Sequence, residues 1–203
     1  MKNPYLLSDK AISILQRRAV RRFTKAKSKA ALLKFDELYV INLLKNLYED
    51  LAKDNEQLFL ELAQKQYRAA EPQAEELPTK KWLSALLLAY DPITLYVYQH
   101  EIDRKRDRAM EAINSSPKKA QEFKKALKYW AQMTAQYADE ISDKASLKAW
   151  KDIGTKRVQW HTEEDDRVCE YCAPLDGKTF DIDKVPPKQH WGCRCWLTPV
   201  KED

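Results

Sequence analysis

The sequence predicts an α+β fold that is mostly α, in which a long helical region is followed by a small β-hairpin or sheet unit. Only three glycines occur in 203 residues, and 33% of the residues are charged, a composition typical of helical chains. Apolar residues recur at helical spacing through most of the chain. All four cysteines lie in one short segment near the C-terminus, where strand-like alternation replaces the helical pattern.

The first predicted helix carries most of the positive charge. Ten of the 36 basic residues, but only one of the 31 acidic residues, lie in the first 34 positions. Two interpretations remain open: an arm that binds nucleic acid through salt-sensitive phosphate contacts, and a solvated helix face. The bases at helical spacing, here called the basic stripe, are Arg17, Arg18, Arg21, Arg22 and Lys25, and the apolar residues expected on the other face are Ile12, Ile14, Leu15 and Val20.

The middle of the chain predicts further helices with few interruptions. Apolar residues recur at i, i+3, i+4 and i+7 from Asp36 to Tyr67, which predicts one long amphipathic helix with Asp36 as its N-cap. The other predicted boundaries are a linker at residues 71–79, a helix capped by Thr79, a helix that starts at Asp91-Pro92 and runs to Ile113, a turn at residues 114–117, and a last helix that ends at Gly154.

The β unit is predicted from three segments. Lys156 to Thr162 alternates polar and apolar residues, as a half-buried strand does. Asp176-Gly177 lies between extended flanks and predicts a hairpin turn of type I′. Trp196 to Val200 can form the strand that closes the sheet.

Five potential metal ligands lie in this β unit. Cys169 and Cys172 form a C-x2-C pair, and His190, Cys193 and Cys195 follow as H-x2-C-x-C. Two tight pairs joined by a loop of this length are typical of a tetrahedral structural Zn²⁺ site. Four places are open to five candidates. Cys169, Cys172 and Cys195 are the first three choices, and either His190 or Cys193 supplies the fourth ligand.

Disulfides and metal-free reduced thiols are the alternatives to a metal site. The N-terminal segment lacks the apolar core of a signal peptide, so we expect a cytosolic origin, where disulfides are rare. Unrelated buried thiols would not be confined to one short segment in two pairs. A unit of about 50 residues also buries little core by itself, so a metal would compensate for this.

An ordered succession of motifs runs through the C-terminal segment. It consists of Val158-Gln159-Trp160, Asp166-Arg167-Val168-Cys169, Cys172, Leu175-Asp176-Gly177-Lys178, Phe180, Pro186-Pro187, His190, Cys193-Arg194-Cys195 and Pro199. With this succession, the chain over about residues 130–200 resembles the Mu F-like head morphogenesis proteins of tailed bacteriophages. One position departs from the pattern, because Trp191 stands where the family commonly has proline.

This resemblance implies a minor head protein that acts in head morphogenesis at or near the portal vertex. The implied location is the virion, and the implied partners are portal protein, major capsid protein or both, with packaged DNA as a further contact. We divide the chain into a helical region with a basic arm, residues 1–125, and a Mu F-like domain with the Cys/His metal site, residues 126–203. The alternative function is a zinc-containing module that binds nucleic acid.

Enzymatic activity is not expected. His100 lies in a predicted helix and His161 in a predicted strand, and a lone histidine in either place is more often a surface or packing residue than a catalyst. The sequence contains neither a glycine-rich phosphate loop nor a nucleophile elbow. No apolar run is long enough for a membrane span. We therefore expect neither a small-molecule substrate nor a membrane among the partners.

Overall fold

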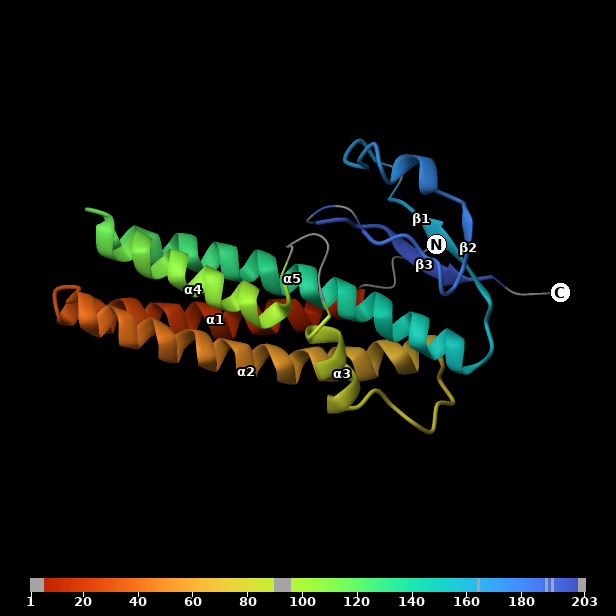
Figure 1. The fold of residues 1–203 in the computed structure, drawn as a ribbon, viewed down its shortest axis with the longest axis horizontal. Coiled ribbons are helices and arrows are strands. Elements are labelled where there is room, and N and C mark those ends of the chain that lie inside the picture. Colours follow the sequence, from red (N-terminus) through yellow and green to blue (C-terminus); the bar gives the residue numbers. More distant parts are fainter. Residues whose placement is uncertain (1–5, 90–95, 164, 189, 191, 201–203) are drawn as a thin grey trace.

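Four long helices form an antiparallel bundle, to which a small sheet is attached at one end (Figure 1). The computed structural model describes residues 6–89, 96–163, 165–188, 190 and 192–200. The bundle helices are α1 (Leu6–Leu32), α2 (Glu37–Ala70), α4 (Tyr98–Ser115) and α5 (Lys119–Asp152), and the shorter α3 is Lys80–Leu87. The expectation of a mostly helical α+β fold is confirmed. Among the described helices, none combines the length and the apolar character that a membrane crossing requires.

Local capping signals place two helix starts correctly. The Asp36 side chain accepts a hydrogen bond from the Tyr39 amide at 2.8 Å, and the Thr79 hydroxyl accepts one from the Trp82 amide at 3.3 Å. These bonds satisfy amides that have no partner within the first helical turn.

The start of α4 differs from the expectation. The expected start at Asp91-Pro92 lies outside the described residues, and the helix begins at Tyr98 after the extended N-cap residue Val97. Tyr98 is 3% exposed, and its ring meets that of Tyr137 edge to face at a centroid distance of 4.7 Å. Packing of this ring against α5 therefore fixes the first turn, where no capping side chain does.

The bundle core combines aromatic residues and alanines with leucines and isoleucines. Trp130 is fully buried at the centre and meets the Tyr48 ring edge to face at 5.3 Å. On α1, the expected apolar face is only partly correct, because Ile14 and Val20 are exposed and the side chain of Ile12 lies outside the described part. Leu15 is buried as expected, and it shares helical spacing with the other residues that α1 buries, which are mostly small: Ala19, Phe23, Ala26 and Ala30. Alanines let α1 approach its neighbours closely.

The sheet has three antiparallel strands in the order β2-β1-β3. They are β1 (Arg157–His161), β2 (Thr179–Asp181) and β3 (Trp196–Pro199), and a short 3₁₀ helix, η1 (Ala173–Leu175), lies between β1 and β2. Val158 pairs with Phe180 on one side and with Pro199 on the other. Both predicted strands therefore pair in one sheet, with the predicted first strand at its centre, and β2 follows the predicted turn at Asp176-Gly177.

The turn at Asp176-Gly177 is of type II and not of the expected type I′. Asp176 has φ −55° and ψ 133°, Gly177 has φ +70°, and the Lys178 amide donates to the Leu175 carbonyl at 3.0 Å. Only the second central position needs a positive φ in this turn, and the glycine occupies it. The turn leads from η1 into β2 and does not join two adjacent strands directly.

Helix α5 belongs to both hydrophobic cores. Its residues from Phe123 to Ala145 pack in the bundle, whereas Trp150 packs with Val158 and Trp160 in the C-terminal unit. The boundary that we expected between residues 125 and 126 falls inside this helix. The two-domain division itself remains a prediction.

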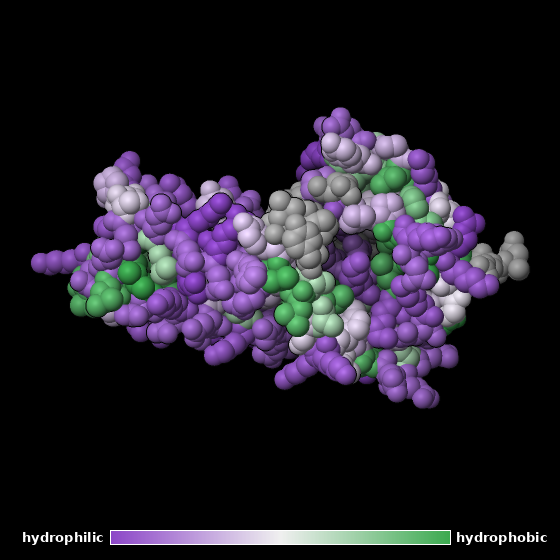
Figure 2. Space-filling view, viewed as in Figure 1, coloured by the Kyte–Doolittle hydropathy of each residue, from purple (hydrophilic) through white to green (hydrophobic). Residues whose placement is uncertain are grey.

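The turn between α1 and α2 is strained and apolar. Lys34 and Phe35 have positive φ values of 50° and 56°, a region that costs a residue with a Cβ about 1 kcal/mol. Leu32, Leu33 and Leu38 are 82%, 50% and 70% exposed around it. Figure 2 shows apolar side chains gathered at this end of the bundle, farthest from the sheet.

Replacing Lys34 by glycine is expected to raise the free energy of unfolding by about 0.5–1 kcal/mol. Glycine adopts a φ of +50° without a Cβ clash, and the exposed Lys34 side chain contributes little packing. Urea unfolding followed by circular dichroism measures the change. Lys34→Ala is the control, because it removes the same side chain but keeps the Cβ atom. An equal gain from alanine would show that the backbone conformation is not the cause.

Candidate metal centre

The first pair of cysteines lies on a tight turn after β1. The Ala173 amide donates to the Cys169 carbonyl at 3.0 Å, which closes the turn. The Cys172 amide donates to the Cys169 Sγ atom at 3.3 Å. Both thiols are thereby turned to the same side, and Cys172 is buried whereas Cys169 is half-buried.

The second group of donors lies between β2 and β3. Cys195 directly precedes β3, so the pairing of β3 with β1 fixes its place beside the sheet. Gly192, next to Cys193, has a φ of +72°, a backbone conformation that favours glycine. Cys193 and Cys195 are buried, and His190 is half-buried.

The fold brings the two groups together. The Sγ atom of Cys172 lies 3.7 Å from that of Cys193 and 4.0 Å from Nε2 of His190. The donor atoms of Cys169, Cys172 and His190 lie within 4.8 Å of one another, and so do those of Cys172, Cys193 and Cys195. Cys172 is therefore common to both clusters.

All five donors line one small cavity. Its volume is about 20 Å³, which suits a single ion or water. Two sulfur atoms on one tetrahedral Zn²⁺ lie about 3.8 Å apart, given Zn–S bonds of about 2.3 Å. The Cys172–Cys193 separation of 3.7 Å is close to that value. The donor set and its spacing could hold a metal ion, and the role of each residue as a ligand stays a prediction.

The thiols differ in how readily they ionise. Burial opposes ionisation of Cys169, but hydrogen bonds from Cys172 and from the Cys172 and Tyr171 amides outweigh it and lower its pKa. A hydrogen bond from Cys195 lowers the pKa of Cys193 to about 5. Burial raises the pKa of Cys172 to about 12, and the hydrogen bond with Cys193 raises that of Cys195. A divalent cation among these four thiols would favour the thiolate form of each of them.

An ion pair ties the two donor groups together. The guanidinium of Arg194, between Cys193 and Cys195, donates through both terminal nitrogens to the carboxylate of Asp165, with one of these bonds at 2.8 Å. The hydrogen bond from Arg194 lowers the pKa of Asp165. Sequence reasoning missed this pair, because Asp165 and Arg194 lie 29 positions apart.

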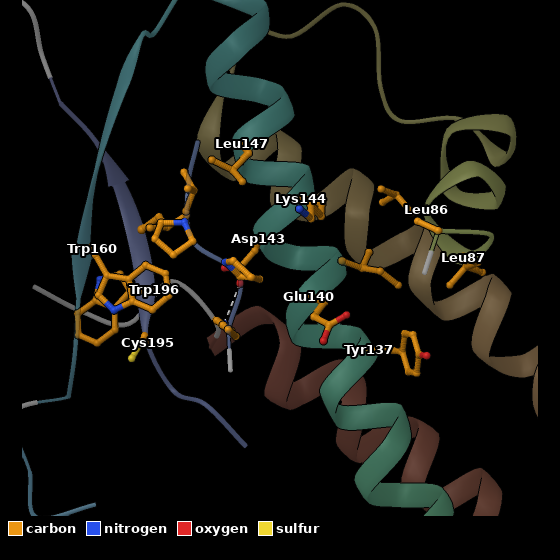
Figure 3. A pocket seen from close by; sticks show the side chains of 17 residues that line it. Leu86, Leu87, Tyr137, Glu140, Asp143, Lys144, Leu147, Trp160, Cys195 and Trp196 are labelled. Atoms are coloured by element: carbon orange, nitrogen blue, oxygen red, sulfur yellow. Dashed lines mark ion pairs between the residues drawn. The ribbon is translucent and has the colours of Figure 1, made fainter. Parts of the chain in front are cut away.

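Two residues of α5 also hold the second donor group. The Gly192 amide donates to the Gln136 side chain at 2.9 Å, and Lys188 pairs with Asp143 at 2.8 Å. Figure 3 shows Asp143 pointing from α5 toward the loop that carries Lys188. Sequence reasoning missed both residues of α5, because a polar residue inside a helix gives no local sign of a distant partner.

A larger cavity separates α5 from parts of the C-terminal unit. Its volume is about 240 Å³, and residues of α3, α5, β3 and the segment 185–188 line it (Figure 3). Trp160 and Trp196 form part of its wall. Apolar packing between α5 and this side of the unit is therefore incomplete.

The basic stripe lies on α1 and contributes nothing to the metal centre. Arg17, Arg18, Arg21 and Lys25 are exposed. Arg22 is engaged within the bundle, because its guanidinium pairs with Asp50 at 2.6 Å and with Asp54 at 2.8 Å. These contacts raise its pKa, with the hydrogen bond to Asp54 as the largest cause. Nucleic-acid binding by the five stripe residues stays a prediction.

The two other histidines lie outside the donor cluster. His161 in β1 stacks on the Trp196 ring with centroids 5.6 Å apart, and its Nε2 atom lies 2.7 Å from the Thr198 hydroxyl. His100 is exposed on α4. Both positions agree with surface and packing roles.

Residues 102–198 match the family model described as Phage Mu protein F like protein. The matched region runs from α4 through the end of the sheet and includes all five donors. Neither the curated proteins nor the solved structures include a match to the chain.

Proposed function

Because residues 102–198 belong to the phage Mu protein F-like family, we propose that this protein is a minor head protein of a tailed bacteriophage, acting in head morphogenesis at or near the portal vertex. The family match supports a phage head-related protein and a place in the virion. The observation that carries the proposal is the coincidence of this match with a compact Cys/His centre inside it.

The role that we assign is structural and not catalytic. A catalytic zinc site keeps an open coordination position, whereas structural sites are closed by four protein ligands. Here five donors line one cavity of about 20 Å³, so protein ligands are sufficient to close all four positions of a tetrahedral ion. The centre then acts as a cross-link that holds the C-terminal unit in the shape that its partners bind.

Zn²⁺ is the metal that we propose for this centre. Four thiols and one imidazole are soft donors, and zinc commonly takes such sets in tetrahedral sites. Cys169, Cys172 and Cys195 would hold the ion together with either His190 or Cys193. When bound, the ion supplies the positive charge that offsets the thiolates and joins the two donor groups.

Elemental analysis is expected to find about one Zn²⁺ per chain in protein purified without chelator, since four ligands close one site. His190→Ala and Cys193→Ser should lose zinc unequally. Removing the true fourth ligand opens the site, whereas the other residue only supports the site from outside the coordination sphere. Protein purified in this way that contained no metal would exclude the zinc centre. Equal and negligible losses would show that neither residue is the fourth ligand.

Portal protein, major capsid protein or both are the proposed partners, and the capsid interior or portal vertex is the proposed location. The test is the protein content of purified heads from phage that carry a chain truncated before Trp160. We expect this chain to be absent from heads, because the truncation removes the sheet and all five donors. Normal content of the truncated chain in heads would show that the C-terminal unit is not the docking element.

A zinc-containing module that binds nucleic acid is the alternative function. The exposed bases Arg17, Arg18, Arg21 and Lys25 favour it. Neutralising Arg17, Arg18 and Arg21 should then weaken DNA binding and reduce its salt dependence, since fewer phosphates are neutralised. Arg22→Gln is the matched control on the same helix, because Asp50 and Asp54 already engage this arginine.

A further inference from the structure

The segment that carries His190 and Cys193 has little regular structure of its own. It lies between β2 and β3, and no described residue from Ile182 to Cys195 belongs to a helix or strand. Its turn at Gly192 points into open space, since an added Cβ would meet nothing within 4 Å. Contacts from outside the segment must therefore set where these two donors lie.

Gln136 of α5 makes such a contact with the turn itself. Its Oε1 atom accepts the Gly192 amide hydrogen bond at 2.9 Å, and its Nε2 atom donates to the Glu140 carboxylate at 2.9 Å. A backbone amide can only donate and a carboxylate can only accept, so both partners fix the same orientation of the Gln136 amide. The side chain is 3% exposed and cannot swing away without breaking both bonds.

A second contact joins α5 to this segment. Asp143 pairs with Lys188 at 2.8 Å, two turns along the helix from Gln136. Gln136, Glu140 and Asp143 follow the i, i+4, i+7 spacing and so share one face of α5. The cavity of about 240 Å³ lies along that helix and against residues 185–188, so close apolar packing does not hold the segment there.

We propose that Gln136 is a positioning residue for the metal centre, which holds the Gly192 turn so that His190 and Cys193 face Cys172. This inference rests on the proposed metal centre and extends it into the helical bundle. Residues that orient metal ligands through hydrogen bonds commonly lower metal affinity about 10- to 100-fold when they are replaced. Gln136 holds the backbone at Gly192, next to Cys193. Because Gln136 lies on α5, the helical bundle thereby sets the geometry of the metal centre.

The test uses the full zinc-loaded chain and the rate at which excess chelator removes the zinc. Gln136→Met keeps the length of the side chain but neither accepts nor donates these hydrogen bonds. We expect zinc release to be about 10- to 100-fold faster in this variant. The matched control is Gln132→Met, which makes the same change one turn earlier on α5, at an exposed position. Its release rate should equal that of the wild type.

A rescue variant separates positioning from general damage to the helix. In Gln136→Glu combined with Glu140→Gln, a carboxylate at position 136 can still accept from Gly192, and the amide at 140 can donate back to it. This double variant should restore slow release. Amide hydrogen exchange at Gly192 adds a direct measurement: protection is expected in the wild type, the Gln132→Met variant and the double variant, and its loss in Gln136→Met.

The outcomes distinguish this inference from the proposed metal centre. A wild-type chain that binds no zinc would overturn both. A chain that binds zinc and releases it equally fast with Gln136→Met would overturn the positioning role alone. Should Gln136→Met fail to fold, the double variant and the exchange rate of the Gly192 amide in the wild type still test whether Gln136 positions the turn. An unprotected Gly192 amide in the zinc-loaded wild type would then exclude the contact.

Discussion

Replacing Cys172 by serine is expected to abolish metal binding and to unfold the C-terminal unit while the helical bundle stays folded. Cys172 is the one donor common to both clusters and is 2% exposed. The free energy of zinc binding to small structural units is about 10–16 kcal/mol at neutral pH, and most of it stabilises the fold. Three short strands cannot replace so large a contribution.

Two spectroscopic signals separate the bundle from the C-terminal unit in this experiment. Far-ultraviolet circular dichroism should keep its helical signal, because the bundle has its own core around Trp130 and Tyr48. Dispersed amide resonances of β1 to β3 should disappear. Ala173→Ser is the control, since it introduces a serine at an exposed neighbouring position. A Cys172→Ser chain with the zinc content of the wild type would show that Cys172 is not a ligand.

Replacing Asp143 by leucine is expected to cost about 3–5 kcal/mol of unfolding free energy, because it removes the carboxylate that pairs with the buried Lys188 ammonium. The two side chains are only 15% and 8% exposed. Burial alone lowers the pKa of Lys188, but the Asp143 carboxylate outweighs it and holds this pKa above its usual value. Loss of Asp143 therefore removes the largest of the effects that oppose burial. Urea unfolding measures the loss.

The double variant Asp143→Leu with Lys188→Met should recover most of this loss. Burial raises the pKa of Asp143 even though Lys188 opposes the shift, so ionising this carboxyl is costly in the folded protein. Buried ion pairs of this kind can be replaced by apolar residues of similar size at little cost. Asp107→Leu is the exposed control, since its pair with Arg106 lies at the surface and such pairs contribute about 0–1 kcal/mol. Equal losses at both aspartates would contradict a special role for burial.

Local signals account for the parts of the fold that the sequence predicted well. Asp36 and Thr79 cap their helices through hydrogen bonds to residues three positions away, so the pattern is complete within a few residues. The face of α1 was predicted less well because a search for large apolar residues selects Ile14 and Val20. The bundle instead buries small alanines, whose value depends on how closely the neighbouring helices approach.

In the candidate metal centre too, local patterns could be predicted from the sequence and distant contacts could not. The spacing of Cys169, Cys172 and the later donors indicated a cluster, because each group lies on one turn of chain. Gln136 gave no such indication, since its partner Gly192 lies 56 positions away. The pair of Asp165 with Arg194 gave no local signal either, since the two residues lie 29 positions apart. Contacts between elements that are distant in sequence could not be predicted from one chain.

The position of α5 in both cores also sets an order of events during synthesis. The helix ends at Asp152, and the last donor, Cys195, follows 43 residues later. A ribosome that adds about 5–20 residues per second needs about two to nine seconds for this stretch, whereas helical bundles fold in microseconds to milliseconds. The bundle therefore has time to form before the last donor is made. Metal binding at the proposed centre would then follow bundle formation, on a template that already presents Gln136 and Asp143.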